Sequence, residues 1–490
     1  MPGMNRAQFL EKFVYAVEKD LDVNGSTASW AASDQKPAHR FWGEEDYKIE
    51  VPHGDNTQYG TTLSALSPDK KFIATSSGAM VSIFNIETKE CCLTFKGLVK
   101  SAIGIDFIPV LTNAGGYSLM IATANQPEDD SDLLFLELDR DGRKVQQPQL
   151  LDVDELLEKS LEPIITSTHD LLGPSAIPQL LKTIRADYRN ALNKLQSTLE
   201  SKCLPRITDD LGFYCATPFS SDGKLLLFRI DNRKSHEESS NHVPIKSTKG
   251  LVVYDLVNDV RKHILRHHTD TISWAGFSPD DQNIATASFD GTFRIYDTTT
   301  GKCKHVIGPM GGQGSRGQWS PNSKHVLFTG CKKKTLEDQT VKQTMFVTVY
   351  SAETGQEVAD LTHDDTYKRV LSVAWSLRDE IAINSEAKLL IWNPFNDTIK
   401  TSFVLEIEDR MMRAFARSIR VKWLEEGRVL LLKSSDGTIE MWDQDKNVKW
   451  RLEKPAGIGM IRSAYGEHWL EQSRTLISLD MDGYLRFYNL

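Results

Sequence analysis

The feature that most constrains this fold is a pattern of 21 residues that recurs in three segments. The three segments align with one another without a gap. The copies are FSPDDQNIATASFDGTFRIYD (277–297), WLEEGRVLLLKSSDGTIEMWD (423–443) and WLEQSRTLISLDMDGYLRFYN (469–489). Each copy carries Asp-Gly at its fourteenth and fifteenth positions, and this pair supplies the positive backbone angles that a tight hairpin turn requires. The short flanking runs are rich in β-branched and aromatic residues, as strands are. The chain is therefore predicted to be built from a repeated β-hairpin unit.

Weaker copies fill most of the remaining chain. They lie at 66–85, 101–138, 219–255, 319–351 and 375–393. Together with the full copies they give eight units, or seven if the degenerate segment 101–138 is not a unit. Repeats that pack only on their neighbours can extend over 490 residues as a single body. The prediction is an all-β protein of eight four-stranded sheets, with seven as the alternative.

The repeat resembles that of the WD-repeat (WD40) β-propellers, in which a Gly-His pair, a Ser-Pro-Asp-Gly turn and a hairpin ending in Trp-Asp recur. Ser-Pro-Asp opens two of the units, and Trp442-Asp443 matches the closing pair. The resemblance covers residues 60–490 and implies a β-propeller. It also implies a structural network of Asp, His, Ser and an aromatic residue, which maps best onto His268, Ser288, Asp290 and Tyr296. The corresponding turn and closing residues of the other full copies are Asp436, Trp442 and Asp482.

The two ends of the chain suggest how such a propeller is closed. The last repeat ends at Leu490 after its third strand, and an extended run, Asp46–Pro52, precedes the first repeat. If that run is the missing strand, the chain ends pair in one sheet and leave no open edge. The predicted organisation is one closed propeller at 40–490, preceded at 1–39 by an amphipathic helix and a polar linker. The apolar face of the helix consists of Phe9, Leu10, Phe13, Val14, Val17 and Leu21. We expect it to pack on the outside of the propeller, and the alternative is insertion into a partner or a membrane surface.

Long insertions interrupt the repeats. Three of them (125–132, 231–249 and 331–343) separate the second and third strands of a unit, and the longest, 152–204, is placed between the second and third units. Because connections alternate between the two faces of a propeller, all four are expected on one face, where long loops commonly carry binding. The longest insertion is predicted to be helical. Its apolar stripe either packs on the propeller or docks a partner, and consists of Leu181, Ile184, Tyr188, Leu192, Leu195 and Leu199.

The motifs that would indicate catalysis, a cofactor or a metal fail on their context. GQGSRG (312–317) matches the dinucleotide-binding pattern in letters, but it leads into a strand rather than a helix. His267 and His268 are adjacent on a strand and point to opposite faces, so they cannot share a metal ion. Lys332–Lys334 is followed by two acids and is interpreted as a solvated loop. We expect no enzyme activity, no cofactor and no metal site.

Composition narrows the class of partner. A net charge of −9 argues against direct binding of nucleic acid, which needs a basic face. Six scattered cysteines are interpreted as free thiols of an intracellular protein, cytoplasmic or nuclear, and no apolar run long enough to span a membrane occurs. The predicted function is a non-catalytic scaffold that binds other proteins, as part of a complex and without a small-molecule substrate. The alternatives are a propeller enzyme with a site in the central channel and a subunit of a chromatin or RNA complex.

The candidate contact residues stand just before the turn Asp of each full repeat. They are Phe289, Ser435 and Met481. Two of the three are apolar at positions that a short turn leaves exposed, and exposed apolar clusters often mark a contact site. The alternative is that a neighbouring insertion covers Phe289.

Overall fold

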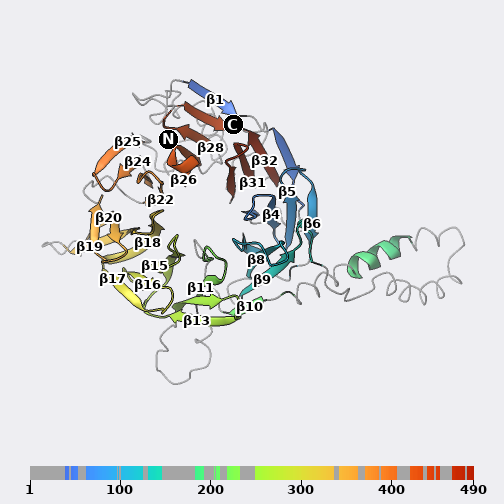
Figure 1. The fold of residues 1–490 in the computed structure, drawn as a ribbon, viewed down its shortest axis with the longest axis horizontal. Helices are drawn as coiled ribbons and strands as arrows, with labels where there is room; N and C mark the ends of the chain where they lie inside the picture. The colour runs from blue at the N-terminus through green and yellow to red at the C-terminus, as the bar shows by residue number, and fades with distance from the viewer. Residues whose placement is uncertain are drawn as a thin grey trace, which may run out of the picture. The chain divides into compact units, whose positions relative to one another are not determined.

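The computed structural model describes the strands of the repeats and the turns between most of them. The residues described are 39–43, 46–52, 62–96, 98, 101–124, 131–145, 182–192, 204, 206–209, 218–231, 249–335, 341–361, 370–385, 388–404, 420–433, 439–445, 448–452, 466–479 and 483–489. Their strands form eight sheets (Figure 1), and within each sheet most strands pair with the strand that precedes or follows them in the chain. The prediction of eight sheets is confirmed, because 101–138 supplies three strands of a sheet of its own. The chain divides into two compact units, Ile49–Asp209 and Met1–Lys48 with Asp210–Leu490.

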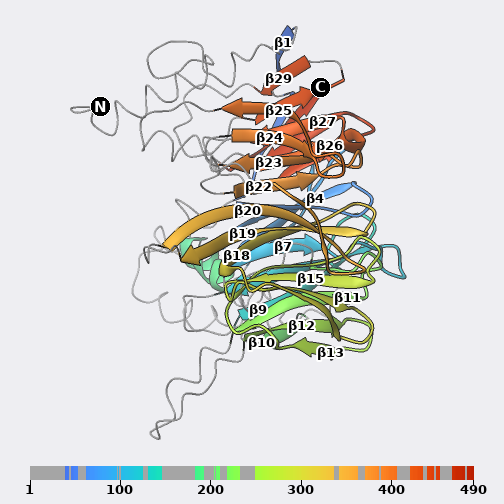
Figure 2. The ribbon, with the colours of Figure 1, turned by 90° about the vertical axis from the view of Figure 1, so that its left-hand side faces the viewer.

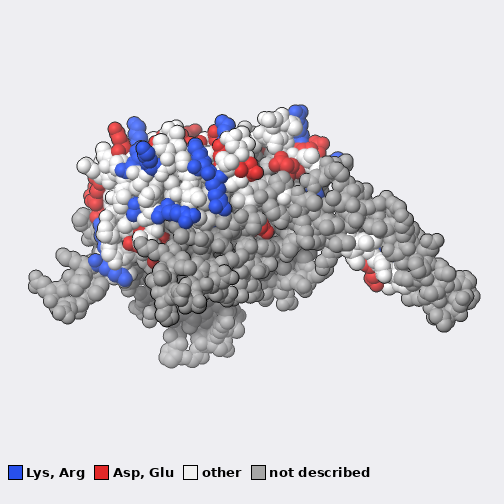
Figure 3. Space-filling model, turned by 90° about the horizontal axis from the view of Figure 1, so that it is seen from below, with Lys and Arg blue, Asp and Glu red and all other residues white. Residues whose placement is uncertain are grey.

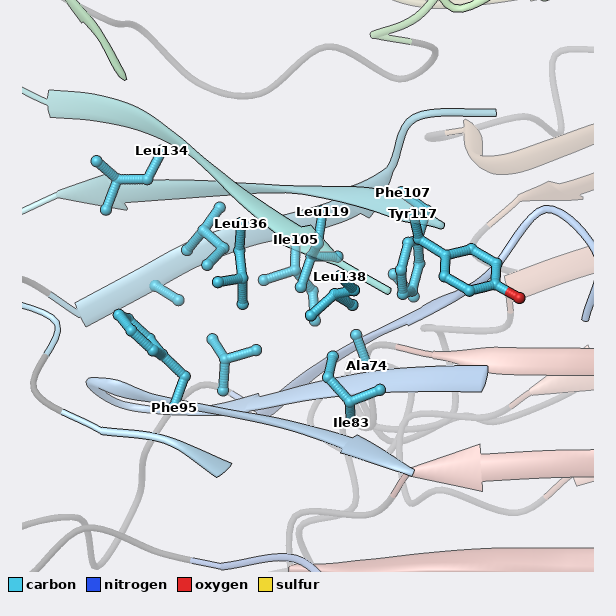
Figure 4. Close-up of a cluster of buried hydrophobic side chains, with 14 of the residues drawn as sticks. Ala74, Ile83, Phe95, Ile105, Phe107, Tyr117, Leu119, Leu134, Leu136 and Leu138 are labelled. Atoms are coloured by element: carbon cyan, nitrogen blue, oxygen red, sulfur yellow. The ribbon is translucent and has the colours of Figure 1, made fainter. Parts of the chain in front are cut away.

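The unit at Ile49–Asp209 holds two four-stranded sheets. The first consists of β3 (Thr62–Leu66), β4 (Phe72–Ser77), β5 (Met80–Asn85) and β6 (Cys91–Phe95). The second consists of β7 (Ser101–Phe107), β8 (Tyr117–Ala124), β9 (Ser131–Leu138) and β10 (Arg206–Asp209). The two sheets share one apolar core, in which Ile105, Leu119 and Leu136 face Ala74 and Ile83 (Figure 4). The Tyr117 hydroxyl adds a polar link by donating to Asp69 of the first sheet at 2.8 Å.

The larger unit holds the other sheets. The third has β11 (Leu225–Asp231), β12 (Lys249–Asp255) and β13 (Val260–Leu265), with a bridge from Phe219 to Leu226 at its inner side. The fourth has β14 (Ile272–Phe277), β15 (Asn283–Ser288), β16 (Phe293–Asp297) and β17 (Cys303–Ile307). The fifth has β18 (Gly311–Trp319), β19 (His325–Thr335), β20 (Val341–Ser351) and β21 (Glu357–Asp360). The sixth has β22 (Val370–Trp375), β23 (Ile381–Ser385), β24 (Lys388–Asn393) and β25 (Thr398–Val404).

The last two sheets take strands from both ends of the chain. The seventh has β26 (Arg420–Leu424), β27 (Val429–Lys433), β28 (Ile439–Asp443) and β29 (Val448–Leu452), and β1 (His39–Gly43) lies parallel to β29 as a fifth strand. Most of β1 falls within the predicted propeller at 40–490, although the sequence predicts no strand at this position. The eighth sheet has β30 (Glu467–Leu470), β31 (Thr475–Leu479) and β32 (Tyr484–Asn489), and its outer strand is β2 (Tyr47–Glu50). The backbone N–H of Asp46 donates to the Phe487 carbonyl at 2.9 Å beside this pair. The predicted N-terminal helix lies outside the described residues.

The longest insertion lies elsewhere than expected. Lys144 pairs with Leu138 of β9, and Arg206 of β10 pairs with Leu134 of the same strand. Residues 146–205 therefore interrupt the outer strand of the second sheet and do not connect the second and third sheets, so the prediction that all long insertions share one face is wrong for this one. An outer strand has one unpaired edge, which tolerates such an interruption. A helix covers 182–192, where Tyr188 is 42% exposed, Ile184 and Leu192 are half-buried, and the rest of the predicted stripe lies outside the described residues.

The insertion at 331–343 is also different from its prediction. Its residues continue β19 and β20 as a regular hairpin, which stays paired out to Thr335 and Val341. Figure 2 shows both strands reaching beyond β18. Lys332 fits a strand because its Nζ lies over the Phe346 ring, 5.1 Å from the centroid, and contacts Asp360 at 3.3 Å. The face of an aromatic ring and a carboxylate both attract an ammonium group.

The outer position of β2 generates the first prediction. A chain beginning at residue 53 lacks β2 and loses Val51, which is 1% exposed. We expect it to aggregate or to melt roughly 5 °C lower, because burying one such side chain contributes about 1.5–3 kcal/mol. A chain beginning at residue 46 keeps β2 and is the control for removal of the preceding segment. Equal melting temperatures and a monomeric state for both chains would contradict this role of β2.

The interrupted outer strand generates the second prediction. Replacing 152–200 by a short Gly/Ser linker should leave the melting temperature within about 2 °C of the wild type, because changing the length of a flexible loop costs little. Replacing 152–209 also removes β10 and the buried side chains of Leu204 and Ile207, and should lower it clearly. Circular dichroism melts of the two variants measure the difference. If the shorter replacement unfolds the protein, the insertion belongs to the core.

Candidate functional site

The candidate site is the turn between β15 and β16, at residues 288–292. The turn is closed by the Gly291 N–H, which donates to the Ser288 carbonyl at 3.1 Å. Gly291 has a φ of +79°, and a Cβ there would lie 2.6 Å from the Gly312 carbonyl oxygen. Only glycine meets both conditions without strain, which accounts for the Asp-Gly pair in this repeat.

Behind this turn lies a buried polar network. His268 Nδ1 lies 2.9 Å from Asp290 Oδ2, and His268 Nε2 lies 2.7 Å from Thr286 Oγ1. The Asp290 carboxylate also accepts hydrogen bonds from the Thr292 hydroxyl at 2.7 Å and the Thr269 N–H at 2.9 Å. The side chains of His268 and Asp290 are 2% and 6% exposed. The network therefore fixes the β15–β16 turn to the segment that precedes β14.

Burial and hydrogen bonding set the charges in this network. Burial lowers the pKa of His268, although Asp290 opposes the shift, so the imidazole is neutral. Burial alone would raise the pKa of Asp290, but the hydrogen bonds from Thr292 and Thr269 outweigh it and lower the pKa to about 2. Since an ionised carboxylate only accepts, Nδ1 carries the histidine proton, and Nε2 accepts from the Thr286 hydroxyl.

The structure distributes the predicted network residues differently from the expectation. Ser288 Oγ accepts from the Asp290 N–H at 3.1 Å and donates to the Asp270 carbonyl at 3.1 Å. The Tyr296 ring packs into the core shared with the third sheet, and its buried hydroxyl makes no hydrogen bond within the described part of the chain. Thr286 and Thr292 hold the positions that sequence reasoning missed. Little in the sequence points to these two threonines, because Thr is common in strands. Thr286 lies two residues before Ser288, and Thr292 lies two residues after Asp290.

The other predicted residues are only partly placed. Phe289 is 40% exposed, and its N–H donates to the Thr271 carbonyl at 2.9 Å. Trp442 is buried in the core shared by the sixth and seventh sheets. The remaining predicted site residues lie outside the described residues, and these are Ser435, Asp436, Met481 and Asp482.

A backbone ladder connects the turn to the long hairpin of the fifth sheet. The Met310 N–H donates to the Gly291 carbonyl at 3.0 Å, and the Lys333 N–H donates to the Met310 carbonyl at 3.2 Å. Lys333 is exposed and Met310 is half-buried. Phe289 therefore stands on a turn that is braced on one side by the network and on the other by the hairpin β19–β20.

The chemistry available to the described residues is limited. They contain no group of three or more His, Cys, Asp or Glu placed to hold a metal ion. GQGSRG lies within β18, so the glycines do not meet a helix N-terminus. The His268–Asp290 pair is an acid–base arrangement in type, but it is buried behind the turn. No helix in the described part of the chain combines the length and the apolar character needed to cross a membrane.

The neutral state of His268 generates a prediction about pH. The folded state binds fewer protons than the unfolded chain, in which histidine titrates near its ordinary pKa of 6.5. The stabilisation is therefore complete above about pH 6.5 and is lost as the pH falls from there toward the lower folded pKa. His268→Gln should lower the melting temperature at neutral pH and make its fall between about pH 7.5 and pH 5.5 shallower than in the wild type. Val306→Ala, on an exposed position of β17, is the control; an unchanged slope in the His268 variant would contradict the assignment.

Comparison with known proteins agrees with this architecture. The family model "WD domain, G-beta repeat" matches residues 260–297, which contain the network and the turn. Coronin-7 of Pongo abelii is 34% identical over 80 residues, a match that spans 16% of this chain and 9% of that protein. The crystal structure of Saccharomyces cerevisiae Sqt1 has a TM-score of 0.53 at 12% identity, with 91% of this chain and 100% of that chain covered. Sqt1 from Chaetomium thermophilum has a TM-score of 0.54 at 11% identity, with coverages of 91% and 99%.

At these identities the two solved structures support the fold alone. The family match adds the repeat itself, at the one unit whose histidine, turn Asp and closing Tyr-Asp are all present. The eight sheets in consecutive order add the architecture. From these findings, residues 260–297 form a WD repeat, and the sheets have the arrangement known from WD-repeat β-propellers.

Proposed function

We propose that this protein is a non-catalytic scaffold that binds partner proteins through the β15–β16 turn, with Phe289 as the central contact. WD-repeat propellers typically serve as protein-interaction scaffolds, and the turn here has the properties of a contact. The observation that carries the proposal is the exposure of Phe289, at 40%, on a turn whose neighbours are immobilised. Aromatic residues dominate binding energy once a partner covers them.

The fixed backbone around Phe289 favours binding at this position. The Phe289 N–H is bonded to Thr271, and the next residue, Asp290, is the most heavily hydrogen-bonded group of the network. A partner would therefore order few additional torsion angles when it covers the ring. Low ordering cost is one of the main sources of affinity at a contact of given area.

The overall charge of the chain bears on the class of partner. On the face drawn in Figure 3, several Lys and Arg gather on the left part of the described surface, and Asp and Glu lie at its edge and farther to the right. The net charge of −9 nevertheless favours a protein partner over a phosphate backbone. Cys91 is an exposed free thiol, and such thiols persist in a reducing compartment, which favours an intracellular location.

The proposal predicts the effect of one truncation. Partners are first identified by pull-down from native extract, and their affinity is then measured for Phe289→Ala. We expect a loss of at least about 2 kcal/mol, roughly a thirtyfold weaker Kd, with the fold retained by circular dichroism. Val306→Ala is the matched control, because Val306 is 54% exposed on the outer strand of the same sheet.

Wild-type affinity in a folded Phe289→Ala protein would remove this turn from the contact. An equal loss in the Val306 control would place the contact on the outer strands instead. The same partner set serves for Met481→Ala, which tests the equivalent position of the last repeat.

A further inference from the structure

A second exposed apolar surface lies where the fifth and sixth sheets meet. Three rings cluster there: the His325 ring centroid lies 5.0 Å from that of Phe395 and 6.5 Å from that of Trp375. Phe395 is 44% exposed, and Leu377, two residues after Trp375, is 64% exposed. We call His325, Trp375, Leu377 and Phe395 the Phe395 patch. Burial lowers the pKa of His325, which favours its neutral form and keeps the patch apolar.

The patch differs from the same position in neighbouring repeats. Trp319 and Trp423 stand where Trp375 does, and their indole N–H groups donate to the Gly276 and Ala374 carbonyls at 3.1 and 3.0 Å. Within the described residues, the buried Trp375 Nε1 makes no hydrogen bond, and the Trp375 ring lies against His325 and Phe395 instead. The exposed part of the Phe395 patch is therefore formed by Leu377 and Phe395, which lie beside a buried ring.

The first strand that the structure describes, β1, starts close to this patch. Strand β1 is parallel to β29, and His39 pairs with Val448, the first residue of β29. The turn before Val448 contains Asp445, which receives two hydrogen bonds from the Arg378 guanidinium at 2.8 and 2.9 Å. Arg378 is the residue after Leu377. Residue 38 therefore joins β1 beside the turn that is bonded to the edge of the Phe395 patch.

We propose that the N-terminal segment, residues 4–21, is the occupant of the Phe395 patch. Its sequence predicts a helix with one apolar face, which includes Phe9, Phe13 and Val17. Residues 22–38 form a tether that can reach up to roughly 55 Å when extended, so distance does not limit docking. A tethered segment acts at an effective concentration in the range of about millimolar, which favours it over a free partner of similar chemistry. The inference is independent of the proposed function, which concerns Phe289.

A photocrosslinking experiment on the full chain tests this proposal. Phe395 is replaced by p-benzoylphenylalanine, the protein is irradiated, and crosslinked peptides are identified by mass spectrometry. We expect a crosslink within one chain to a peptide from residues 4–21, and its loss in the variant that also carries Phe9→Asp and Phe13→Asp. The matched control places the same probe at Val257, which holds the equivalent turn position in the third sheet and is 69% exposed. That probe should not reach residues 4–21.

The other outcomes overturn the proposal. A crosslinked species of twice the mass would make a second copy of the chain the occupant. No crosslink from position 395, or equal crosslinking from positions 395 and 257, would show that the segment does not dock at the Phe395 patch. Melting curves of each probe variant show that the comparison is made on folded protein.

Discussion

The packing of a sheet on the sheets beside it is the constraint on which the rest of this structure depends. In the fourth sheet, Ile284 and Tyr296 belong to the core shared with the third sheet, while Ala285, Phe293 and Ile295 belong to the core shared with the fifth. A strand whose alternate residues are apolar on both faces cannot bury them within a single sheet. A single repeat therefore needs neighbouring sheets to bury its apolar residues. Residues at the ends of its strands, such as Phe289, are held in position by the cores on both faces of the sheet.

This constraint explains why most of the fold was predictable from sequence. The Asp-Gly turn and the strands beside it are local signals, and their repetition in register specified the sheets. Strands β10 and β1 were missed because each is a short outer strand whose partner lies far away in sequence, as Arg206 does from Leu134. The hairpin at Lys332 was read as a loop because its charge suggests solvent, whereas the contacts that hold it, with Phe346 and Asp360, arise only in the folded sheet.

The candidate site, like the fold, was predictable only in part from the sequence. The pair His268 and Asp290 was expected only from the resemblance to WD repeats, and the two side chains lie 2.9 Å apart. Thr286 was not foreseen, because nothing local distinguishes a hydroxyl that bonds to histidine from one that faces a core. The position of Tyr296 was not foreseen either. Its buried hydroxyl makes no hydrogen bond within the described residues, so it does not replace the indole N–H of a Trp at this position. Exposure at Phe289 depends on what neighbouring segments cover, and this is information that no single strand contains.

The departures from the repeat all avoid the hydrogen-bonded interior of a sheet. The longest insertion interrupts the outer strand beside β9, β1 is added outside β29, and β19–β20 is lengthened along its own axis. Each change leaves the ladder between the inner strands intact, so its cost is limited to an edge or an end. Residues at these edges can therefore be inserted or replaced while the hydrogen-bond network behind the β15–β16 turn keeps its geometry. A protein organised in this way can acquire or lose contacts at its edges and ends without altering the packing that makes it fold.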